Sequence, residues 1–347
     1  GTYATIYNPS EYRWPLGISP SGDGLEYKTL NLICGEVPPT RYGGNYKSRG
    51  PQYVRGIQEG NGVPKDSDMW VSYSMNKEDI WVAHVPVPVK TVATAHADDD
   101  FAQYQKLGDL KTWNIYSPLM APVSLRQEWL ELKDEDPFDY ACVERKIPAS
   151  SYLKASFDVQ AAQTRNGSLQ IEFLDEKGIA CTRIELNKEG MIRVKNGARY
   201  GNVMPYQADQ TYRFEATLDT QHRQLNLTVS TLGADGKALQ SKSTKRIFYA
   251  PVHQIERIRF RTGDLRTFPT IDTPADWFGT LEHAGDTDTT ALYRIAHVKT
   301  VSLDADAGSA VLKTADYKHY VDDFNAMEPE VLHTSAIPNA QAWDWMK

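Results

Sequence analysis

Period-two alternation dominates the periodic segments of this 347-residue chain. In residues 2–89 the alternating stretches read TYATIYN, WPLGIS, LEYKTLNLI, PQYVRGI, MWVSYSM and IWVAHVPVPV, and clusters of Gly, Pro, Asp and Asn separate them. Such a pattern is typical of short antiparallel strands, because successive side chains of a strand point to opposite faces. The Gly-Asp-Gly sequence within Ser19–Tyr27 indicates a hairpin turn. The sequence therefore predicts an all-β protein.

Alternation returns between about residue 147 and residue 303, in nine segments that include MIRVKN, TYRFEATLD and QLNLTVSTL. Polar turn sequences such as DEKG, NKEG and GADGK separate these segments. Short strands with polar turns between them, and without a helical period, are typical of a β-sandwich. We therefore expect an antiparallel jelly-roll β-sandwich in this part of the chain.

The remaining segments have a mixed character. In the tail, ADYKHYVDDFNAM (315–327) is predicted to form a helix and AWDWMK (342–347) to begin a second one. We expect four parts along the chain: a first strand-rich part (1–90), a linker with the start of the second domain (91–145), the sandwich (146–303) and a C-terminal extension (304–347).

Composition narrows the classes of function. The formal net charge of −7, without a basic stripe, argues against a nucleic-acid partner. No apolar run approaches the roughly 20 residues of a membrane span. Cys34, Cys142 and Cys181 form no metal-binding or paired pattern, so we interpret them as buried free thiols. The 19 Tyr and 8 Trp residues suit β-structure and also carbohydrate binding, in which flat rings stack on sugars.

The first ninety residues resemble a known family. Ser21-Gly-Asp23-Gly24-Leu-Glu-Tyr27 resembles the Asp-box of sialidase-type (BNR-repeat) β-propellers, whose Asp accepts turn amide hydrogens and whose Gly takes a positive φ. With RYGGNYKSRGPQYVRGIQEGNG and MWVSYSMNKEDIWVAHVPVPV, residues 1–90 resemble the closing blades of bacterial propellers associated with polysaccharide breakdown. A propeller needs about four blades or more. The resemblance thus implies that further blades lie upstream or on a second polypeptide.

The later residues resemble a second domain that follows such propellers. WNIYSP, DPFDYACVERKIP and IRFRTG are similar to segments of concanavalin A-like (laminin-G-like) jelly rolls in secreted bacterial proteins. This resemblance implies a secreted or periplasmic protein. Related jelly rolls often hold a structural Ca²⁺, for which carboxylates are suitable ligands. Because no EF-hand spacing is present, we expect solvated turns at the acidic residues, with a structural Ca²⁺ in the sandwich as the alternative. These residues are Asp134, Glu135, Asp136, Asp139, Asp286 and Asp288.

A basic, phenol-rich loop precedes the predicted innermost strand GPQYVRGI. Cations beside phenols at a channel mouth suit an anionic sugar, since guanidinium binds carboxylate and an activated Tyr serves as acid, base or nucleophile. The alternative is a solvated basic loop with blade packing. Alternation places Gln52, Val54 and Gly56 on one face and Tyr53, Arg55 and Ile57 on the other. The expected anion contacts are Arg41, Lys47, Arg49 and Arg55, and the expected reactive phenol is Tyr42 or Tyr53.

The hairpin tip Asn76-Lys77-Glu78-Asp79 offers a second set of reactive groups. In a propeller it would face the substrate, with Glu78 or Asp79 as a general acid or a water-activating base and Lys77 organising the carboxylate and the substrate. The alternative is a charged hairpin tip with internal ion pairs. His84 is expected to be buried and hydrogen-bonded to backbone.

These features predict a carbohydrate-active enzyme. The expected reaction is that of a glycoside hydrolase or a polysaccharide lyase, and the expected substrate is an acidic, uronate-containing glycan. The alternative is a non-catalytic glycan-binding or scaffolding protein. Nucleotide, zinc-protease and α/β-hydrolase functions are disfavoured, because GxGxxG, Walker, HExxH and GxSxG motifs are all missing from the sequence.

Overall fold

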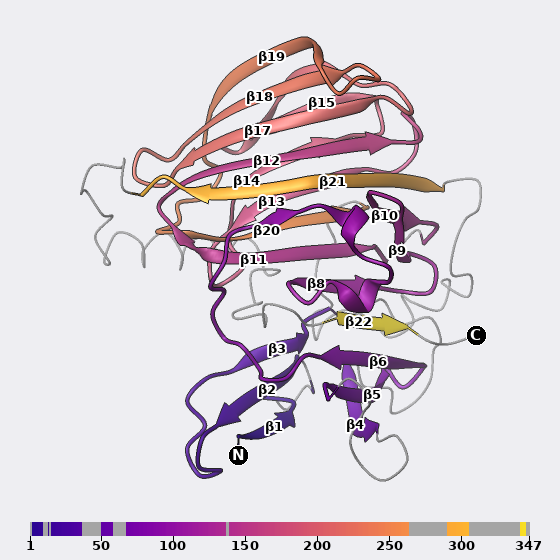
Figure 1. Cartoon of the computed structure of the whole chain (residues 1–347), viewed down its shortest axis with the longest axis vertical. Coiled ribbons are helices and arrows are strands. Elements are labelled where there is room, and N and C mark those ends of the chain that lie inside the picture. The colour runs from indigo at the N-terminus through magenta and orange to yellow at the C-terminus, as the bar shows by residue number, and fades with distance from the viewer. Residues whose placement is uncertain are drawn as a thin grey trace.

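The computed structural model describes residues 2–9, 13, 15–36, 50–57, 67–136, 139–263, 290–304 and 341–344. Its strands form a large β-sandwich, and at the end where the N-terminus lies a three-stranded sheet stands beside the end of one sandwich layer (Figure 1). The strand pairings of the described residues are antiparallel except for one between β22 and β8. The chain is therefore all-β, as the alternation predicts. No helix in these ranges is long and apolar enough to cross a membrane.

One layer of the sandwich is an eight-stranded sheet with the order β19-β18-β17-β12-β21-β10-β9, in which β7 also pairs with β21. Two short 3-10 helices, η1 (Phe101–Gln103) and η2 (Leu107–Asp109), precede its strand β9 in the chain. Its strands are β7 (Asp98–Asp99), β9 (Val123–Arg126), β10 (Trp129–Asp134), β12 (Tyr152–Ala161), β17 (Thr211–Asp219), β18 (Gln224–Leu232), β19 (Ala238–Ile247) and β21 (Ala291–Ser302).

The other layer is an eleven-stranded sheet with the order β16-β15-β14-β13-β20-β11-β8-β22-β6-β5-β4, which extends beyond the sandwich. Its strands are β4 (Pro51–Ile57), β5 (Met69–Met75), β6 (Asp79–Val85), β8 (Trp113–Ser117), β11 (Cys142–Ser150), β13 (Leu169–Leu174), β14 (Ala180–Leu186), β15 (Met191–Asn196), β16 (Arg199–Pro205), β20 (Ile255–Thr262) and β22 (Gln341–Asp344).

The core of the sandwich lies between these two layers. Phe157 of β12 stacks on Phe214 of β17, with ring centroids 5.3 Å apart, and meets Phe260 of β20 edge-on at 5.2 Å. Strand β17 buries every second residue, which is the burial pattern that its alternating sequence predicts. Each fully buried side chain of this kind contributes about 1.5–3 kcal/mol of hydrophobic stabilisation.

A smaller core joins the N-terminal strands to the sandwich. The three-stranded sheet of β1 (Tyr3–Tyr7), β2 (Leu16–Ser21) and β3 (Asn31–Cys34) contributes Leu16 and Ile33 to it. Trp81 of β6 stacks on Tyr116 of β8, with centroids 5.1 Å apart. Within the described ranges these N-terminal strands form two sheets and no closed propeller. Cys34, Cys142 and Cys181 are free and buried, as expected.

The turn at Asp23 has the geometry expected of an Asp-box. The Asp23 Oδ1 atom accepts hydrogen bonds from the backbone N–H groups of Leu25 (2.8 Å) and Glu26 (2.9 Å), and Ser21 Oγ also donates to it (2.9 Å). The hydrogen bonds from Glu26 and Leu25 lower the pKa of Asp23 to about 2. Gly24 has a φ of 77°, so the glycine is needed there for conformational reasons.

One expectation from the sequence is wrong at the junction between the N-terminal strands and the sandwich. A helix was expected to begin in residues 342–347, yet Gln341–Asp344 form β22, which pairs with β6 on one side and with β8 on the other. Hydrogen bonding from two flanking strands overrides the local preference of a short segment. β22 therefore links the N-terminal strands to the sandwich in one continuous sheet. The expected helix at 315–327 lies outside the described residues.

The acidic segment before β11 is not a solvated turn. Asp134, Asp136 and Asp139 are all buried, with exposed fractions of 7%, 8% and 4%. Their carboxylates accept hydrogen bonds from the backbone N–H of Asp136, the backbone N–H of Asp139 and the Tyr116 hydroxyl, respectively. Burial raises the pKa of Asp134 to about 6. No three His, Cys, Asp or Glu side chains of the described ranges are placed to hold a metal ion. Asp286 and Asp288 lie outside those ranges.

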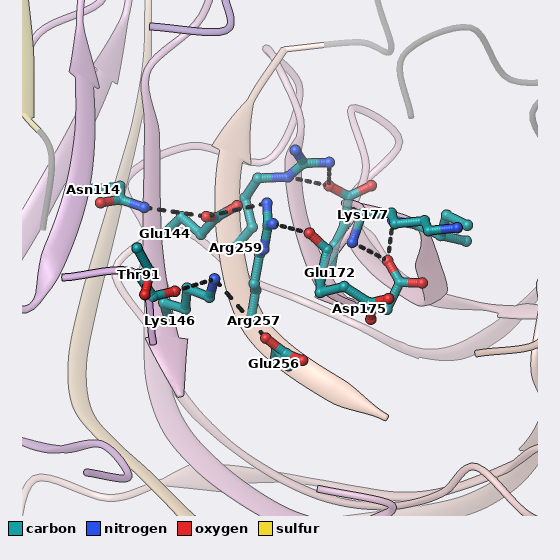
Figure 2. Close-up of polar contacts among 12 residues, drawn as sticks. Thr91, Asn114, Glu144, Lys146, Glu172, Asp175, Lys177, Glu256, Arg257 and Arg259 are labelled. Atoms are coloured by element: carbon teal, nitrogen blue, oxygen red, sulfur yellow. Dashed lines mark hydrogen bonds and ion pairs between the residues drawn. The ribbon is translucent and has the colours of Figure 1, made fainter. Parts of the chain in front are cut away.

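The face of the eleven-stranded sheet that points away from the sandwich core carries buried charges (Figure 2). Glu172 of β13, which is fully buried, accepts from Arg183 Nε (2.6 Å) and is paired with Arg259 (2.6 Å). Burial alone would raise the pKa of Glu172, but the charges of Arg259 and Arg183 outweigh it and hold that pKa well below its usual range. Glu172 therefore remains ionised inside the protein.

Candidate functional site

The side chain of Asn8 holds the segment before β2 against the start of β4. Its Nδ2 atom lies within hydrogen-bond distance of three backbone oxygens, those of Arg13 (3.2 Å), Pro15 (3.1 Å) and Pro51 (2.9 Å). An amide group is suited to this role because its two N–H donors lie close together. Through Asn8, Arg13 is placed beside a strand that lies far from it in the sequence.

Asn76 holds the β5–β6 hairpin tip against the same end of β4. Its Oδ1 accepts from the backbone N–H of Gly50 (2.8 Å), and its own N–H donates to the Gly50 oxygen (3.0 Å). Asn76 and Lys77 both have a φ of 56°. Two successive positive φ values match the twist of a hairpin, and Asn tolerates them better than most residues do. The turn thereby places Lys77 next to β4.

Strand β4 contains a bulge that corrects the predicted alternation. Gln52 pairs with Ser74 and Arg55 pairs with Ser72, with the register shift between these pairs. Because Ser72 and Ser74 are two residues apart, Gln52 and Arg55 share one face, whereas alternation had placed them on opposite faces. The extra residue turns Tyr53 outward with a φ of 55° and a 59% exposed side chain. A bulge re-aims a side chain in this way, often beside a functional site.

Tyr53 has two cations beside it, Arg13 and Lys77. The guanidinium carbon of Arg13 is 5.5 Å from the centre of the Tyr53 ring, and Arg13 Nη1 donates to Oε1 of the buried Gln52 (3.1 Å). The hydrogen bond from Arg13 lowers the pKa of Tyr53, and the positive charge of Lys77 lowers it further. A phenol with a lowered pKa loses its proton more readily, which suits it to act as a nucleophile or a general acid–base group.

The other predicted site residues have different surroundings. Lys77 is exposed beside Tyr53, Glu78 is half-buried in the turn, and Asp79 is only 4% exposed at the start of β6. Arg55 is exposed, on the face that carries Ser72. The remaining predicted residues, Arg41, Tyr42, Lys47 and Arg49, lie outside the described residues. Sequence reasoning missed Arg13 and Gln52, because no sequence signal connects Arg13 with a strand so far along the chain.

His84 is buried as expected, but its partner is a carboxylate. Its Nε2 lies 2.7 Å from Oδ2 of Asp68, and its ring stacks on Trp70 with centroids 4.4 Å apart. Asp68 also accepts from the backbone N–H of Val87 (2.9 Å) and forms an ion pair with Lys111. At 1% exposure, His84 is inaccessible to a substrate, and the group ties β5 and β6 to neighbouring loops.

Replacing Asn76 by Ala is expected to lower the free energy of unfolding by about 1–3 kcal/mol. The buried N–H of Gly50 loses its acceptor, and Ala adopts a positive φ less readily than Asn does. Urea denaturation measures the change. Asn202→Ala, at an exposed position of β16, is the matched control and should stay within about 0.5 kcal/mol of the parent. Equal effects of the two substitutions would contradict the role of Asn76.

Two comparisons with known proteins found matches. Residues 113–277 match the family model described as "Sialidase-like, CBM domain". A solved structure described as "Sialidase" matches 94% of the chain at 58% sequence identity, with a TM-score of 0.78. The chain is thus similar to a sialidase over nearly its whole length. It spans 30% of the length of that sialidase. These findings point to a carbohydrate-active protein.

Other solved structures are more distant. The family 131 beta-glucanase catalytic domain from Podospora anserina is 12% identical, with 64% of this chain and 100% of that chain covered and a TM-score of 0.41. The lectin UEA-II complexed with galactose is 9% identical, with 59% and 98% covered and a TM-score of 0.37. No match was found among the curated proteins.

Proposed function

We propose that this chain is part of a secreted bacterial glycoside hydrolase that acts on an acidic glycan, with Tyr53 as the reactive phenol. The observation that carries the proposal is the exposed phenol of Tyr53 beside the cations Arg13 and Lys77. The 58% identity with a sialidase supports it, since the name of that protein denotes an enzyme that removes an acidic sugar.

The chemistry follows from these groups. Arg13 and Lys77 attract the carboxylate of the sugar by charge and hydrogen bonding. The Tyr53 oxygen, having lost its proton, forms a bond to the anomeric carbon while the glycosidic bond breaks. A protonated carboxyl gives its proton to the leaving oxygen, and half-buried Glu78 is the better candidate because Asp79 is only 4% exposed. Water then releases the sugar from Tyr53 and restores both groups.

The wider site extends beyond the described residues. In this proposal Arg41, Lys47, Arg49 and Arg55 supply further anion contacts, and Tyr42 is the alternative phenol. The sheets β1–β3 and β4–β6 are proposed to be closing blades of a β-propeller, because they pack on each other over one core. The other blades would come from elsewhere in the protein or from a second polypeptide.

A glycan-binding role for the sandwich is the second candidate function. The match of residues 113–277 to a carbohydrate-binding family model favours it. The two roles are compatible, because a binding domain can hold a polymer near a catalytic site. Loss of the Tyr53 phenol distinguishes the two roles: it should abolish cleavage of the glycan but leave glycan binding by the sandwich in place.

The test is turnover of acidic glycans by the protein together with any polypeptide that co-purifies with it. We expect new reducing ends from sialylated or uronate-containing oligosaccharides, without an increase in absorbance near 235 nm. Such an increase would show an unsaturated product and assign a polysaccharide lyase instead. Binding without turnover of any acidic glycan would overturn the enzymatic proposal and leave the binding role.

A further inference from the structure

The outer face of the eight-stranded sheet carries an open hollow of about 440 Å³ over β12, β17, β18 and β19. These four strands lie side by side at one end of the sandwich (Figure 1). The volume lies within the range of about 300–1,000 Å³ that is typical of small-ligand sites. The hollow is formed by the sandwich alone and lies on strands other than those that carry Tyr53.

The strand register puts two lysines at the ends of one row in this hollow. Lys154 pairs with Thr217, Thr217 with Asn226, and Asn226 with Lys245. Three interstrand spacings separate the ends of the row, or about 14 Å between the backbones of Lys154 and Lys245. Both lysines are exposed, and neither forms an ion pair with any residue of the described ranges. Two ammonium groups therefore flank a floor of hydroxyl and amide groups.

A second row completes the polar floor. Glu215 pairs with Thr228, and Thr228 pairs with Ser243, whose hydroxyl lies 2.9 Å from that of Thr228. Hydroxyls offer both a donor and an acceptor, as the hydroxyls of a sugar do. Together with the single carboxylate of Glu215, the two lysines leave the hollow with one net positive charge. None of the residues lining the hollow is aromatic.

Elsewhere on this outer face, the positively charged side chains form ion pairs with neighbouring carboxylates. In the adjacent row, Arg213 binds Asp158 through two contacts of 2.7 Å, and farther along Arg294 donates to Glu131 at 2.8 Å. Lys299 of β21 is paired with Asp98. On this face of the described strands, the positive charge that is not paired is therefore concentrated at the hollow. Because rings are missing from the lining, recognition there depends on charge and hydrogen bonds instead of stacking.

We propose that this hollow is a second glycan-binding site, which takes an anionic oligosaccharide through Lys154 and Lys245 at its ends and the hydroxyl floor between them. The inference builds on the proposed function, because it names the substrate class that the sandwich would hold for the catalytic site. The shared chemistry is an anionic group on a sugar, and either a carboxylate or a sulfate supplies it.

Calorimetric titration of the protein tests the proposal, with three probes: a uronate oligosaccharide, a sulfated oligosaccharide of the same length and a neutral one. We expect an anionic probe to bind at least tenfold more tightly than the neutral one, and the double variant Lys154→Ala/Lys245→Ala to remove that difference. Whichever of the two anionic probes binds more tightly shows whether the site prefers a carboxylate or a sulfate. Equal binding of all three probes, or unchanged binding by the double variant, would overturn the site.

The control variant is Lys242→Ala. Lys242 lies on β19 as Lys245 does, but it pairs with the core residue Val229 and so belongs to the other face of the strand. It should bind the anionic probe within twofold of the parent. If the anionic probe binds through the two lysines but no glycan is cleaved, only the enzymatic proposal is refuted. If a glycan is cleaved but binding does not depend on the lysines, only the glycan-binding site in the hollow is refuted.

Discussion

Replacement of Tyr53 by Phe is expected to lower kcat/KM for the cleaved glycan by about 10²- to 10⁴-fold, which is the usual contribution of a group that moves a proton or attacks the substrate. The phenol is exposed, so its loss costs the fold little. Initial rates with the acidic substrate measure the effect, and thermal unfolding shows whether the variant is intact. Tyr27→Phe, at another partly exposed tyrosine, should retain full activity. A Tyr53→Phe variant with parental rates would contradict the assignment.

The pKa of Tyr53 tests whether the neighbouring cations act on the phenol, because a purely structural role of Arg13 would leave that pKa unchanged. The difference between the ultraviolet titrations of the parent and of Tyr53→Phe isolates this one phenol. In Arg13→Gln the hydrogen bond that lowers the pKa of Tyr53 is weakened, so the phenolate should appear at higher pH than in the parent. The pH at which activity rises should move in the same direction. An unchanged midpoint would show that Arg13 does not act on Tyr53.

Replacement of Glu172 by Gln is expected to lower the free energy of unfolding by about 3–5 kcal/mol, because the buried Arg183 and the 11% exposed Arg259 then lose the charge that offsets theirs. Chemical denaturation at neutral pH measures the loss. Glu189→Gln is the control, since Glu189 is exposed in the turn after β14. That variant should change stability by less than about 0.5 kcal/mol.

The contribution of Glu172 to the free energy of unfolding should also depend on pH. Its pKa in the folded protein lies below that of an unfolded chain, so ionised Glu172 stabilises the fold above the unfolded value of about 4.3. This contribution is lost as the pH falls from that value through the folded one. The stability difference between the parent and Glu172→Gln should therefore narrow below about pH 4. A difference that stayed constant down to acid pH would show that ionisation of Glu172 is not the source of the effect.

Much of the strand pattern could be predicted from the sequence. The predicted segments MWVSYSM, MIRVKN, TYRFEATLD and QLNLTVSTL coincide with β5, β15, β17 and β18. Each has a clear alternation and ends at a turn sequence, so local chemistry determines both its extent and its buried face. Strand β16 (Arg199–Pro205) was missed, because its Gly and Pro weaken the alternation and it forms by pairing with β15.

The candidate site was predictable only in part. Tyr53 and Lys77 were recognised as reactive residue types in a suitable segment, but the sequence alone did not show that they are neighbours. Their proximity depends on the hydrogen bonds of Asn76 with Gly50 and on the bulge after Gln52. A bulge is set by the pairing of two strands, and alternation within one strand cannot reveal it.

The amino-acid sequence by itself determined the all-β class, the extent of most strands and the Asp23 turn, because side chains within a few residues of one another decide these features. Only the tertiary structure decided that Arg13 lies against Tyr53, that β22 joins β6 to β8, and that Asp134 is buried. Each of these depends on partners far apart in the chain, whose meeting is set by the packing of whole sheets.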